Sequence, residues 1–382
     1  MTERRVSEAG TKVQTPGASF PMHNSPRVWF LTSALSPLAV RLIKLLLAHG
    51  DNVAAGLPPG EIENEERSAE FRELINECKS GRKDREGWKD RIRGIRCDGR
   101  VMGQCGAAVA EAVEVFGRID ILLCCTSEAV VGTVEELSTS SATQNLVRDQ
   151  FEIIFFSQVN YIKATLPLLR QRHNGHIIIL TGITGHIGTP GMPFYSAAIW
   201  ALEGYCDSLA YEIAPFNVKL TIVQPNKEIP VLTNKITFAP QLPQYDSNNN
   251  PAPGLRDILT NVVNSHPETR IGNTQSQNDE ETLVSRYPKL PSEARGRLVL
   301  ETVHALTAIG GHENPPARHI VGYEGVASVK EKLKTVSEEL EDFVEVSCAV
   351  DIFKSDVGRA ALSGARVDTN LGDVQLGQPS SI

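Results

Sequence analysis

The chain has 382 residues, of which 38 are Lys or Arg and 46 are Asp or Glu, and its formal net charge is −8. No basic stripe stands out, so the composition argues against a nucleic-acid-binding protein. No run of about 18 apolar residues is present, so we expect no segment that crosses a membrane.

The seven cysteines are an odd number, and several lie in apolar segments rather than at spacings typical of disulfide frameworks or zinc sites. Residues 1–26 are polar, contain scattered Pro and Ser, and lack the apolar core that a signal peptide needs. We therefore expect reduced thiols, a cytosolic protein and a disordered lead over residues 1–26.

Short apolar runs and segments of helical periodicity follow one another from residue 27 onward. The apolar runs predict strands at 27–32, 52–57, 95–98, 119–125, 176–180, 218–223 and 318–322. The helical periodicity predicts helices at 37–49, 101–116, 148–172, 195–214, 294–307 and 326–346. The polar stretches 246–253 and 271–293 are typical of exposed loops, and residues 354–382 of a frayed tail.

Residues 58–93 are rich in charge, and Phe71, Leu74, Ile75 and Cys78 have the spacing of an amphipathic helix within them. We expect a surface helix followed by a turn at Gly81. A run of charges of this kind is usually a solvated face, although a helix that docks a partner is the alternative.

The segment TSALSPLA, residues 32–39, joins the first strand to the first helix. Ser36 is a favourable N-cap, Pro37 suits the first helical position, and Gly50 suits the position after the last turn. Residues 175–223 then form a strand, a loop, a helix and a strand. Because open α/β sheets bind ligands at the carboxyl ends of their strands, the loop after residue 180 is the expected place for chemistry.

The segment YSAAIWALEGYCDSLAYEIAPFNVKLTIVQP, residues 195–225, closely resembles the short-chain dehydrogenase/reductase (SDR) superfamily, in which a strand ending in Ser precedes a Tyr-x-x-x-Lys helix. The resemblance covers residues 27–232 and returns at 298–323. It implies an α/β fold with a Rossmann-like doubly wound parallel sheet and helices on both faces. The domain would span 27–353, with insertions at 58–93 and 234–297 and charged helices added near the C-terminus.

The resemblance places the proton-transferring residue at Tyr195. The family's Ser, which lies thirteen residues earlier, corresponds to Gly182, and its Lys, four residues later, corresponds to Ile199. The Asn of the preceding helix corresponds to Ile154. Without the Lys, nothing at these positions favours the ionised Tyr, so the resemblance predicts a site in which only Tyr195 is retained.

The expected cofactor site also lacks residues that the family uses there. The three glycines of the family's phosphate turn are Ser33, Pro37 and Ala39, which add a Cβ, remove an N–H donor and crowd the helix against the strand. A good strand-to-helix turn without a ligand is thus favoured over tight dinucleotide binding, although the Ser33 and Ser36 hydroxyls remain able to donate to a phosphate. The positions that the family would use for the cofactor are Thr32, Ser33, Ser36, Leu38, Asp98, Cys124, Ser127 and Pro225.

Two of these positions have specific alternatives. Asp98 corresponds to the family's adenine-binding Asp, and a turn or helix-capping aspartate is an equally good interpretation. Cys124 and Cys125 replace the two asparagines of the family's NNAG element, and neighbouring strand residues point to opposite faces, so we expect two buried thiols rather than a redox pair. No acidic residue ends the second strand, which favours NADP(H) if a cofactor binds.

Several residues near the loop after residue 180 carry groups that would serve as substitutes. Alternation along the strand directs Thr181 away from the site and leaves Thr184 as the better hydroxyl. His186 is expected to be a loop residue at the surface, and Lys227 lies on the next loop.

The sequence therefore supports two functions. One is an SDR-fold protein with an eroded active site that acts by binding or regulation, which the residues at the site favour. The other is an NADP(H)-dependent oxidoreductase that interconverts a carbonyl and an alcohol with Tyr195 as proton carrier, which the resemblance favours. The family also implies a homo-oligomer through the helices at 148–172 and 195–214, and an unidentified small-molecule ligand.

Overall fold

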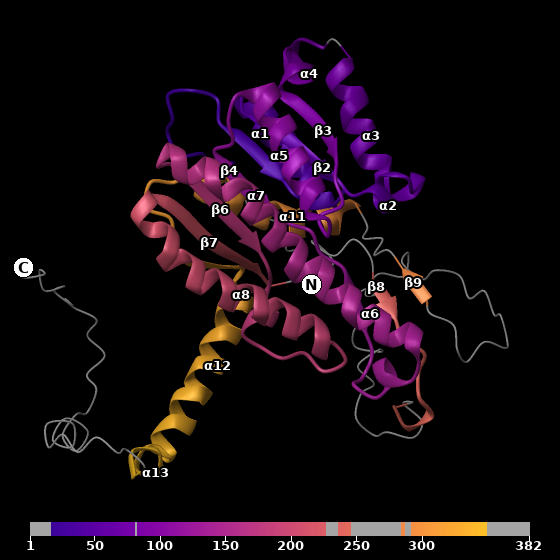
Figure 1. Cartoon of the computed structure of the whole chain (residues 1–382), viewed down its shortest axis with the longest axis vertical. Coiled ribbons are helices and arrows are strands. Elements are labelled where there is room, and N and C mark those ends of the chain that lie inside the picture. The colour runs from indigo at the N-terminus through magenta and orange to yellow at the C-terminus, as the bar shows by residue number, and fades with distance from the viewer. Residues whose placement is uncertain (1–16, 81, 227–235, 246–283, 287–291, 350–382) are drawn as a thin grey trace, which may run out of the picture. The chain divides into compact units, whose positions relative to one another are not determined.

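A seven-stranded parallel sheet forms the centre of the fold (Figure 1). The computed structural model describes residues 17–80, 82–226, 236–245, 284–286 and 292–349. The strand order is β10-β7-β6-β4-β1-β2-β3, so the order reverses between β1 and β4 as in a doubly wound sheet. The strands are β1 Val28–Leu31, β2 Asn52–Leu57, β3 Ile92–Arg96, β4 Ile121–Cys124, β6 Gly175–Leu180, β7 Val218–Pro225 and β10 Arg318–Val321.

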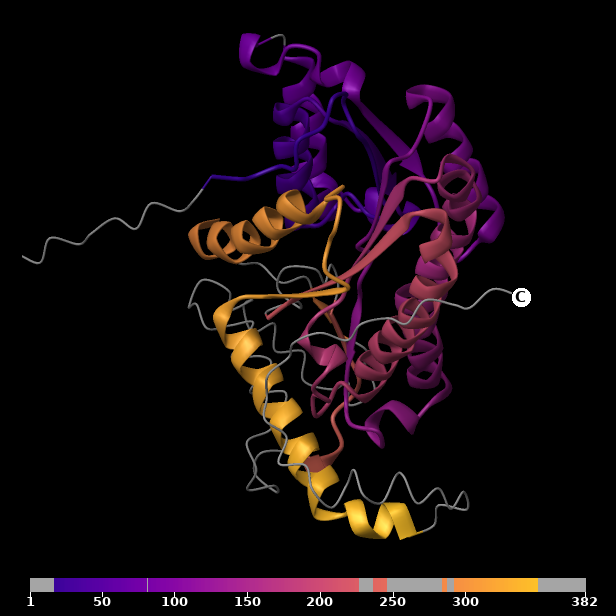
Figure 2. The ribbon, with the colours of Figure 1, turned by 90° about the vertical axis from the view of Figure 1, so that its left-hand side faces the viewer.

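Helices cover both faces of this sheet, as predicted (Figure 2). Alternation along β1 sends Trp29 and Leu31 into one apolar core and Phe30 into the other. The first core lies under α1 Pro37–His49, α3 Glu65–Lys79 and α11 Ser292–Ile309. The second lies under α5 Met102–Phe116, α7 Ser157–Arg172 and α8 Pro193–Ile213.

Most predicted elements are confirmed within a few residues. Helix α1 begins at Pro37 with Ser36 as its N-cap, and Gly50 ends it with a φ of 105°. Residues 58–93 contain α2 Pro59–Ile62, α3 and α4 Trp88–Arg91, which together cross from β2 to its parallel neighbour β3. Because β3 ends at Arg96, Asp98 lies in the turn beyond the strand and not at its end.

The helix predicted at 148–172 is longer than expected and is interrupted. It begins as α6 Ser141–Phe151, where Ser140 and Thr143 form a capping box that the sequence analysis did not recognise. A π-helical turn, Glu152–Phe156, then leads into α7. Such turns are rare and occur frequently at functional sites, and this one contains Ile154.

A second, three-stranded sheet was not predicted. It consists of β5 Ala129–Val131, β8 Ile236–Phe238 and β9 Val284–Arg286, in the order β5-β8-β9. β9 falls within the stretch 271–293 that was expected to be a loop. Strands of three residues leave no periodic pattern in a sequence, and the pairing of β5 with β8 joins segments more than 100 residues apart.

The chain divides into two compact units, residues 1–330 and 331–382. The predicted C-terminal helix is two helices, α12 Tyr323–Asp342 and α13 Val344–Ala349. No described helix combines the length and the apolar character that a membrane crossing needs. The predictions for residues 1–16, Gly81, the loop 246–253 and the tail 354–382 lie outside the described residues.

Part of the lead that the composition predicted to be disordered makes defined contacts. The Phe20 ring stacks on His49 with 3.8 Å between ring centroids, and Arg118 donates to the Pro26 carbonyl at 2.7 Å. Residues 17–26 therefore lie against the amino-terminal edge of the sheet.

Candidate functional site

Tyr195 lies in the first turns of α8 and is fully buried. Its side chain belongs to an apolar cluster that joins α8 to the small sheet and to the π-helical turn. Ile199, one helical turn further on, is 3% exposed and lies in the same cluster. The remaining buried members are Ala129, Val131, Ile154, Met192, Ala198 and Ile236.

Thr181 and His186, on the segment after β6, direct their side chains to partners outside this cluster. Thr181 donates to Glu203 Oε1 of α8 at 2.7 Å, which confirms that its hydroxyl points elsewhere. Thr184 is buried, and its carbonyl accepts from Trp200 Nε1 at 2.7 Å. His186 Nε2 lies 3.0 Å from Gln224 Oε1, so its ring is held against β7. Lys227 lies outside the described residues.

The turn between β1 and α1 is buried. Ser33, Ser36 and Leu38 are each 0% exposed. The Ser36 hydroxyl accepts from Ala39 N at 3.0 Å, as an N-cap does. Ala34 N donates to the Gly56 carbonyl of β2 at 2.9 Å. These donors are therefore bonded within the protein rather than directed outward.

Ser33 does not need a glycine-like backbone. Among the described non-Gly residues, positive φ occurs at His173 and Asn217. The Cβ that Ser33 adds to this turn is thus accommodated without a left-handed backbone.

A cleft of about 320 Å³ opens at the carboxyl ends of β1 to β4. It is lined by residues that follow each of these strands, among them Thr32, Glu61, Asp98 and Thr126. Thr32 joins the two central strands: its hydroxyl accepts from Cys125 N at 2.9 Å and bonds Thr126 Oγ1 at 3.0 Å. The cleft has the position that ligand sites of open α/β sheets take.

Asp98 is engaged by Arg100 within this cleft. Arg100 Nε and Nη2 donate to the two carboxylate oxygens at 2.9 and 2.7 Å, and Arg100 N adds a bond of 3.0 Å. The side-chain hydrogen bonds from Arg100 lower the pKa of the Asp98 carboxyl below its usual value. Helix α5 begins at Met102, so Asp98 is a turn aspartate and not a helix cap.

The remaining predicted positions are buried. Cys124 faces the α5–α7–α8 core and Cys125 faces the α1 core, which confirms their opposite directions. Burial raises the pKa of the Cys125 thiol to about 11, so it is protonated at neutral pH. Ser127 is 5% exposed, and Pro225 ends β7, where it pairs with Val321 of β10.

Gln158 is a residue of this region that the sequence analysis missed. It lies on α7 and is 2% exposed. Its amide nitrogen donates to the Thr126 carbonyl at 2.9 Å, and its Oε1 lies 3.4 Å from Thr32 Oγ1. A polar residue one helical turn after Ile154, on the stripe that faces the sheet, was the available signal.

Comparison with known proteins identifies the family. A family model described as short chain dehydrogenase matches residues 63–233. Oxidoreductase BOA17 of Botryotinia fuckeliana is 30% identical over 200 residues, which are 52% of this chain and 65% of the relative. A crystal structure of a short-chain dehydrogenase from Streptomyces avermitilis has a TM-score of 0.60 at 23% identity and covers 86% of this chain and 100% of its own. The chain belongs to the short-chain dehydrogenase/reductase superfamily.

A second curated relative matches a shorter part of the chain. 3-Ketodihydrosphingosine reductase of Bacteroides thetaiotaomicron is 38% identical over 118 residues, 31% of this chain and 42% of the relative. The chain therefore spans less than two thirds of the length of the curated relatives that it matches here.

In this SDR fold three of the four positions that the resemblance assigns to catalysis lie in one apolar cluster. Tyr195, Ile199 and Ile154 share it, and Gly182 follows β6 at the same edge of the sheet. At the two positions that the resemblance aligns with the family's Lys and Asn, the structure has buried isoleucines.

Proposed function

We propose that this chain is an SDR-fold protein whose catalysis is impaired and which acts by binding a ligand. The observation that carries the proposal is the surroundings of Tyr195: the ring is 0% exposed, and Ile199 occupies the place of the family's Lys. A Tyr acts as a base when a neighbouring positive charge favours its ionised form. An isoleucine supplies none.

The turn after β1 supports the same proposal. A dinucleotide's pyrophosphate binds to outward-facing N–H groups at a helix N-terminus. Here Ala39 N is bonded to Ser36, Pro37 has no N–H, and the turn is buried. The residues present at this turn do not fit the pyrophosphate of NAD(P)(H), and we assign no chemical step to that cofactor.

The cleft beside Asp98 is the better candidate for a ligand. Its lining combines Glu61 and Asp98 with Arg100 and the Thr126 hydroxyl, and its volume of about 320 Å³ suits a nucleoside-sized molecule. Glu61 disfavours a 2′-phosphate and Arg100 favours one, so NADH and NADPH both need to be titrated.

The experiment is a calorimetric titration of the full chain with NADPH and with NADH. We expect weak or no binding of either dinucleotide. A dissociation constant in the low micromolar range would overturn the proposal and favour an oxidoreductase.

The oxidoreductase is the second candidate, because curated relatives are named oxidoreductase and reductase. It is tested by reduction of aromatic and quinone carbonyls with NADPH. We expect little activity in the natural chain and a gain in the double variant Gly182→Ser, Ile199→Lys. Gly182 has an extended backbone with a φ of −171°, which Ser adopts without strain.

The matched control is the same double variant with Tyr195→Phe, which we expect to abolish the gain. Substantial activity of the natural chain that Tyr195→Phe alone removes would show instead that Tyr195 already works as a catalyst. A homodimer through α7 and α8 is part of this proposal, and light scattering of the purified chain measures it.

A further inference from the structure

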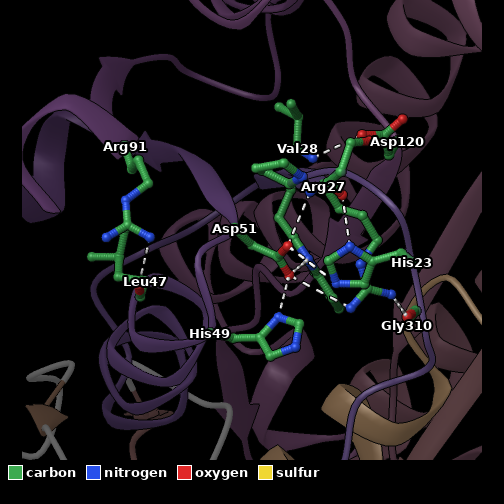
Figure 3. A network of polar contacts seen from close by, with 12 residues as sticks. His23, Arg27, Val28, Leu47, His49, Asp51, Arg91, Asp120 and Gly310 are labelled. Atoms are coloured by element: carbon green, nitrogen blue, oxygen red, sulfur yellow. Dashed lines mark hydrogen bonds and ion pairs between the residues drawn. The ribbon is translucent and has the colours of Figure 1, made fainter. Parts of the chain in front are cut away.

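Three side chains with metal-ligating atoms meet at the amino-terminal edge of the sheet, the edge opposite the cleft (Figure 3). His23 comes from the segment before β1, His49 from the last turn of α1, and Asp51 from the turn before β2. Their ligating atoms all lie within 4.8 Å of one another. His23 Nε2 is 3.7 Å from Asp51 Oδ1, and His49 Nδ1 is 3.6 Å from Asp51 Oδ2.

We propose that His23, His49 and Asp51 form a binding site for a divalent transition-metal ion of the zinc type. Zinc is bound by imidazole nitrogen and carboxylate oxygen, and sites with three protein ligands leave the fourth position to water. Bonds of about 2.1 Å in a tetrahedron place the ligand atoms ~3.4 Å apart. The two His–Asp pairs thus need to close by a few tenths of an ångström.

The ligands are already oriented for this role. His23 Nδ1 lies 2.6 Å from the Ser25 carbonyl, so it carries the proton and leaves the Nε2 lone pair facing Asp51. A ligating His donates its other N–H to a carbonyl or carboxylate in most metal sites. The stack of Phe20 on His49 fixes the second ring.

Asp51 is the fixed member of the set. It is 0% exposed, its Oδ1 accepts from Arg27 N at 2.9 Å, and its Oδ2 accepts from Trp29 Nε1 at 3.2 Å. Oδ1 keeps a lone pair for another partner, whereas Oδ2 also faces Arg27 Nη2 at 3.5 Å. The two histidines are the accessible members, with side chains that are 22% and 28% exposed, so an ion can enter from their side.

The charge of Arg27 and the two imidazoles together determine which ions the site binds. Arg27 Nη2 lies 3.5 Å from Asp51 Oδ2 and already offsets the carboxylate charge. Mg²⁺ and Ca²⁺ depend on several oxygen ligands and gain little from such a site, whereas Zn²⁺, Ni²⁺ and Cu²⁺ gain from the two imidazoles. A bound ion would fasten residues 17–26 to α1 and β2. This role is independent of the function proposed for the carboxyl edge.

The test is a calorimetric titration of the full reduced chain with ZnCl₂, with MgCl₂ as the reference. We expect one zinc ion per chain, no heat from magnesium, and a rise in melting temperature with zinc. His23→Ala and His49→Ala should each weaken zinc binding by about 100-fold or more, since loss of a supporting partner alone costs 10–100-fold. His312→Ala, an exposed histidine outside the set, is the matched control and should bind like the natural chain.

Cobalt distinguishes these ligands from the thiols. The absorption spectrum of the Co²⁺-loaded chain should show visible ligand-field bands without thiolate-to-cobalt charge transfer. Absence of stoichiometric zinc binding, an unchanged affinity in His49→Ala, or a thiolate spectrum would each overturn the proposal. His23 lies in the segment before β1, so its variant keeps the core intact and gives a result even if His49→Ala is unstable.

Discussion

The cluster around Tyr195 and the network around Asp51 lie at opposite edges of the same sheet and have opposite compositions. Tyr195, to which the resemblance assigns proton transfer, lies in a cluster of apolar side chains. At the other edge the carboxylates of the buried Asp51 and the partly buried Asp120 accept hydrogen bonds from the backbone N–H groups of Arg27 and Val28 (Figure 3).

The difference shows what each polar group does for folding. Asp51 and Asp120 accept from the backbone N–H groups of Arg27 and Val28, so replacing either would leave a buried donor unsatisfied. The Lys and Asn of the family's active site serve chemistry instead. At the positions that the resemblance aligns with them, Ile199 and Ile154 are buried in one apolar cluster, which stabilises the fold by packing.

The largest predicted effect comes from putting a charge back beside Tyr195. Ile199→Lys buries an ammonium in an apolar cluster and should lower the stability at pH 7 by about 4 kcal/mol, three pKa units at 1.36 kcal/mol each. The folded-state pKa of this Lys lies below its unfolded value, so the penalty should shrink as the pH rises toward 10. Urea denaturation at pH 7 and 10 measures it, with Ile199→Met as the matched control.

Equal stability of the Lys and Met variants at pH 7 would contradict this prediction. It would mean that a polar partner or water receives the ammonium. The two edges would then resemble each other more than the apolar cluster suggests.

The second prediction concerns His176 at the amino edge. Its Nδ1 accepts from Gly311 N at 3.1 Å, and its Nε2 lies 2.9 Å from Thr221 Oγ1, whose own proton goes to the Pro316 carbonyl. Both ring nitrogens of His176 are thus hydrogen-bonded when the ring is neutral. Burial, with smaller contributions from Lys219 and other cations, lowers the pKa of His176 to about 3.

The unfolded histidine titrates near pH ~6.5. The contribution of the neutral His176 ring to the stability is therefore complete above that pH, and it is lost as the pH falls toward the folded-state pKa. From pH 7 to 5 the stability advantage of the natural chain over His176→Gln should shrink by about 2 kcal/mol. Urea denaturation of both proteins at the two pH values gives the difference. A constant advantage would show that the folded chain takes up the proton.

The third prediction concerns Thr32, which joins β1 to β4. Thr32→Val keeps the shape but leaves the buried Cys125 N without its acceptor, so the stability should fall by about 1–2 kcal/mol. Thr32→Ser retains the hydroxyl and should cost less. If both variants lose the same amount, the methyl contacts of Thr32 matter more than its hydrogen bonds.

Local sequence signals predicted the two ends of helix α1. Ser36, Pro37 and Gly50 specify the two ends of α1 by their own conformational preferences, and the structure has both ends where they were expected. The SDR resemblance predicted the doubly wound sheet, and the fold confirms it.

The surroundings of Tyr195 were not predictable in the same way. Its burial depends on Ala129 and Ile236, which come from two three-residue strands. No local sequence pattern predicts that these strands pair. The contacts of His23 and Phe20 depend in turn on where α1 ends in space. Sequence periodicity reports which side of an element is apolar, and it does not report which distant segment covers that side.

The smallest predicted effect belongs to Asp98, where two interpretations of the sequence remain. Its ion pair with Arg100 is partly exposed, with side chains 23% and 48% accessible, so Asp98→Asn should cost less than about 1 kcal/mol. Because Arg100 lowers the pKa of Asp98, this contribution is present above pH ~4 and disappears as the pH falls through the folded-state value. Urea denaturation at pH 7 and pH 3 measures it. An adenosine nucleotide titrated into both proteins then separates the interpretations. A turn aspartate predicts similar affinity in both proteins. An adenine-binding aspartate predicts a loss of affinity much larger than the loss of stability, and that result would identify the adenine-binding residue of the proposed ligand cleft.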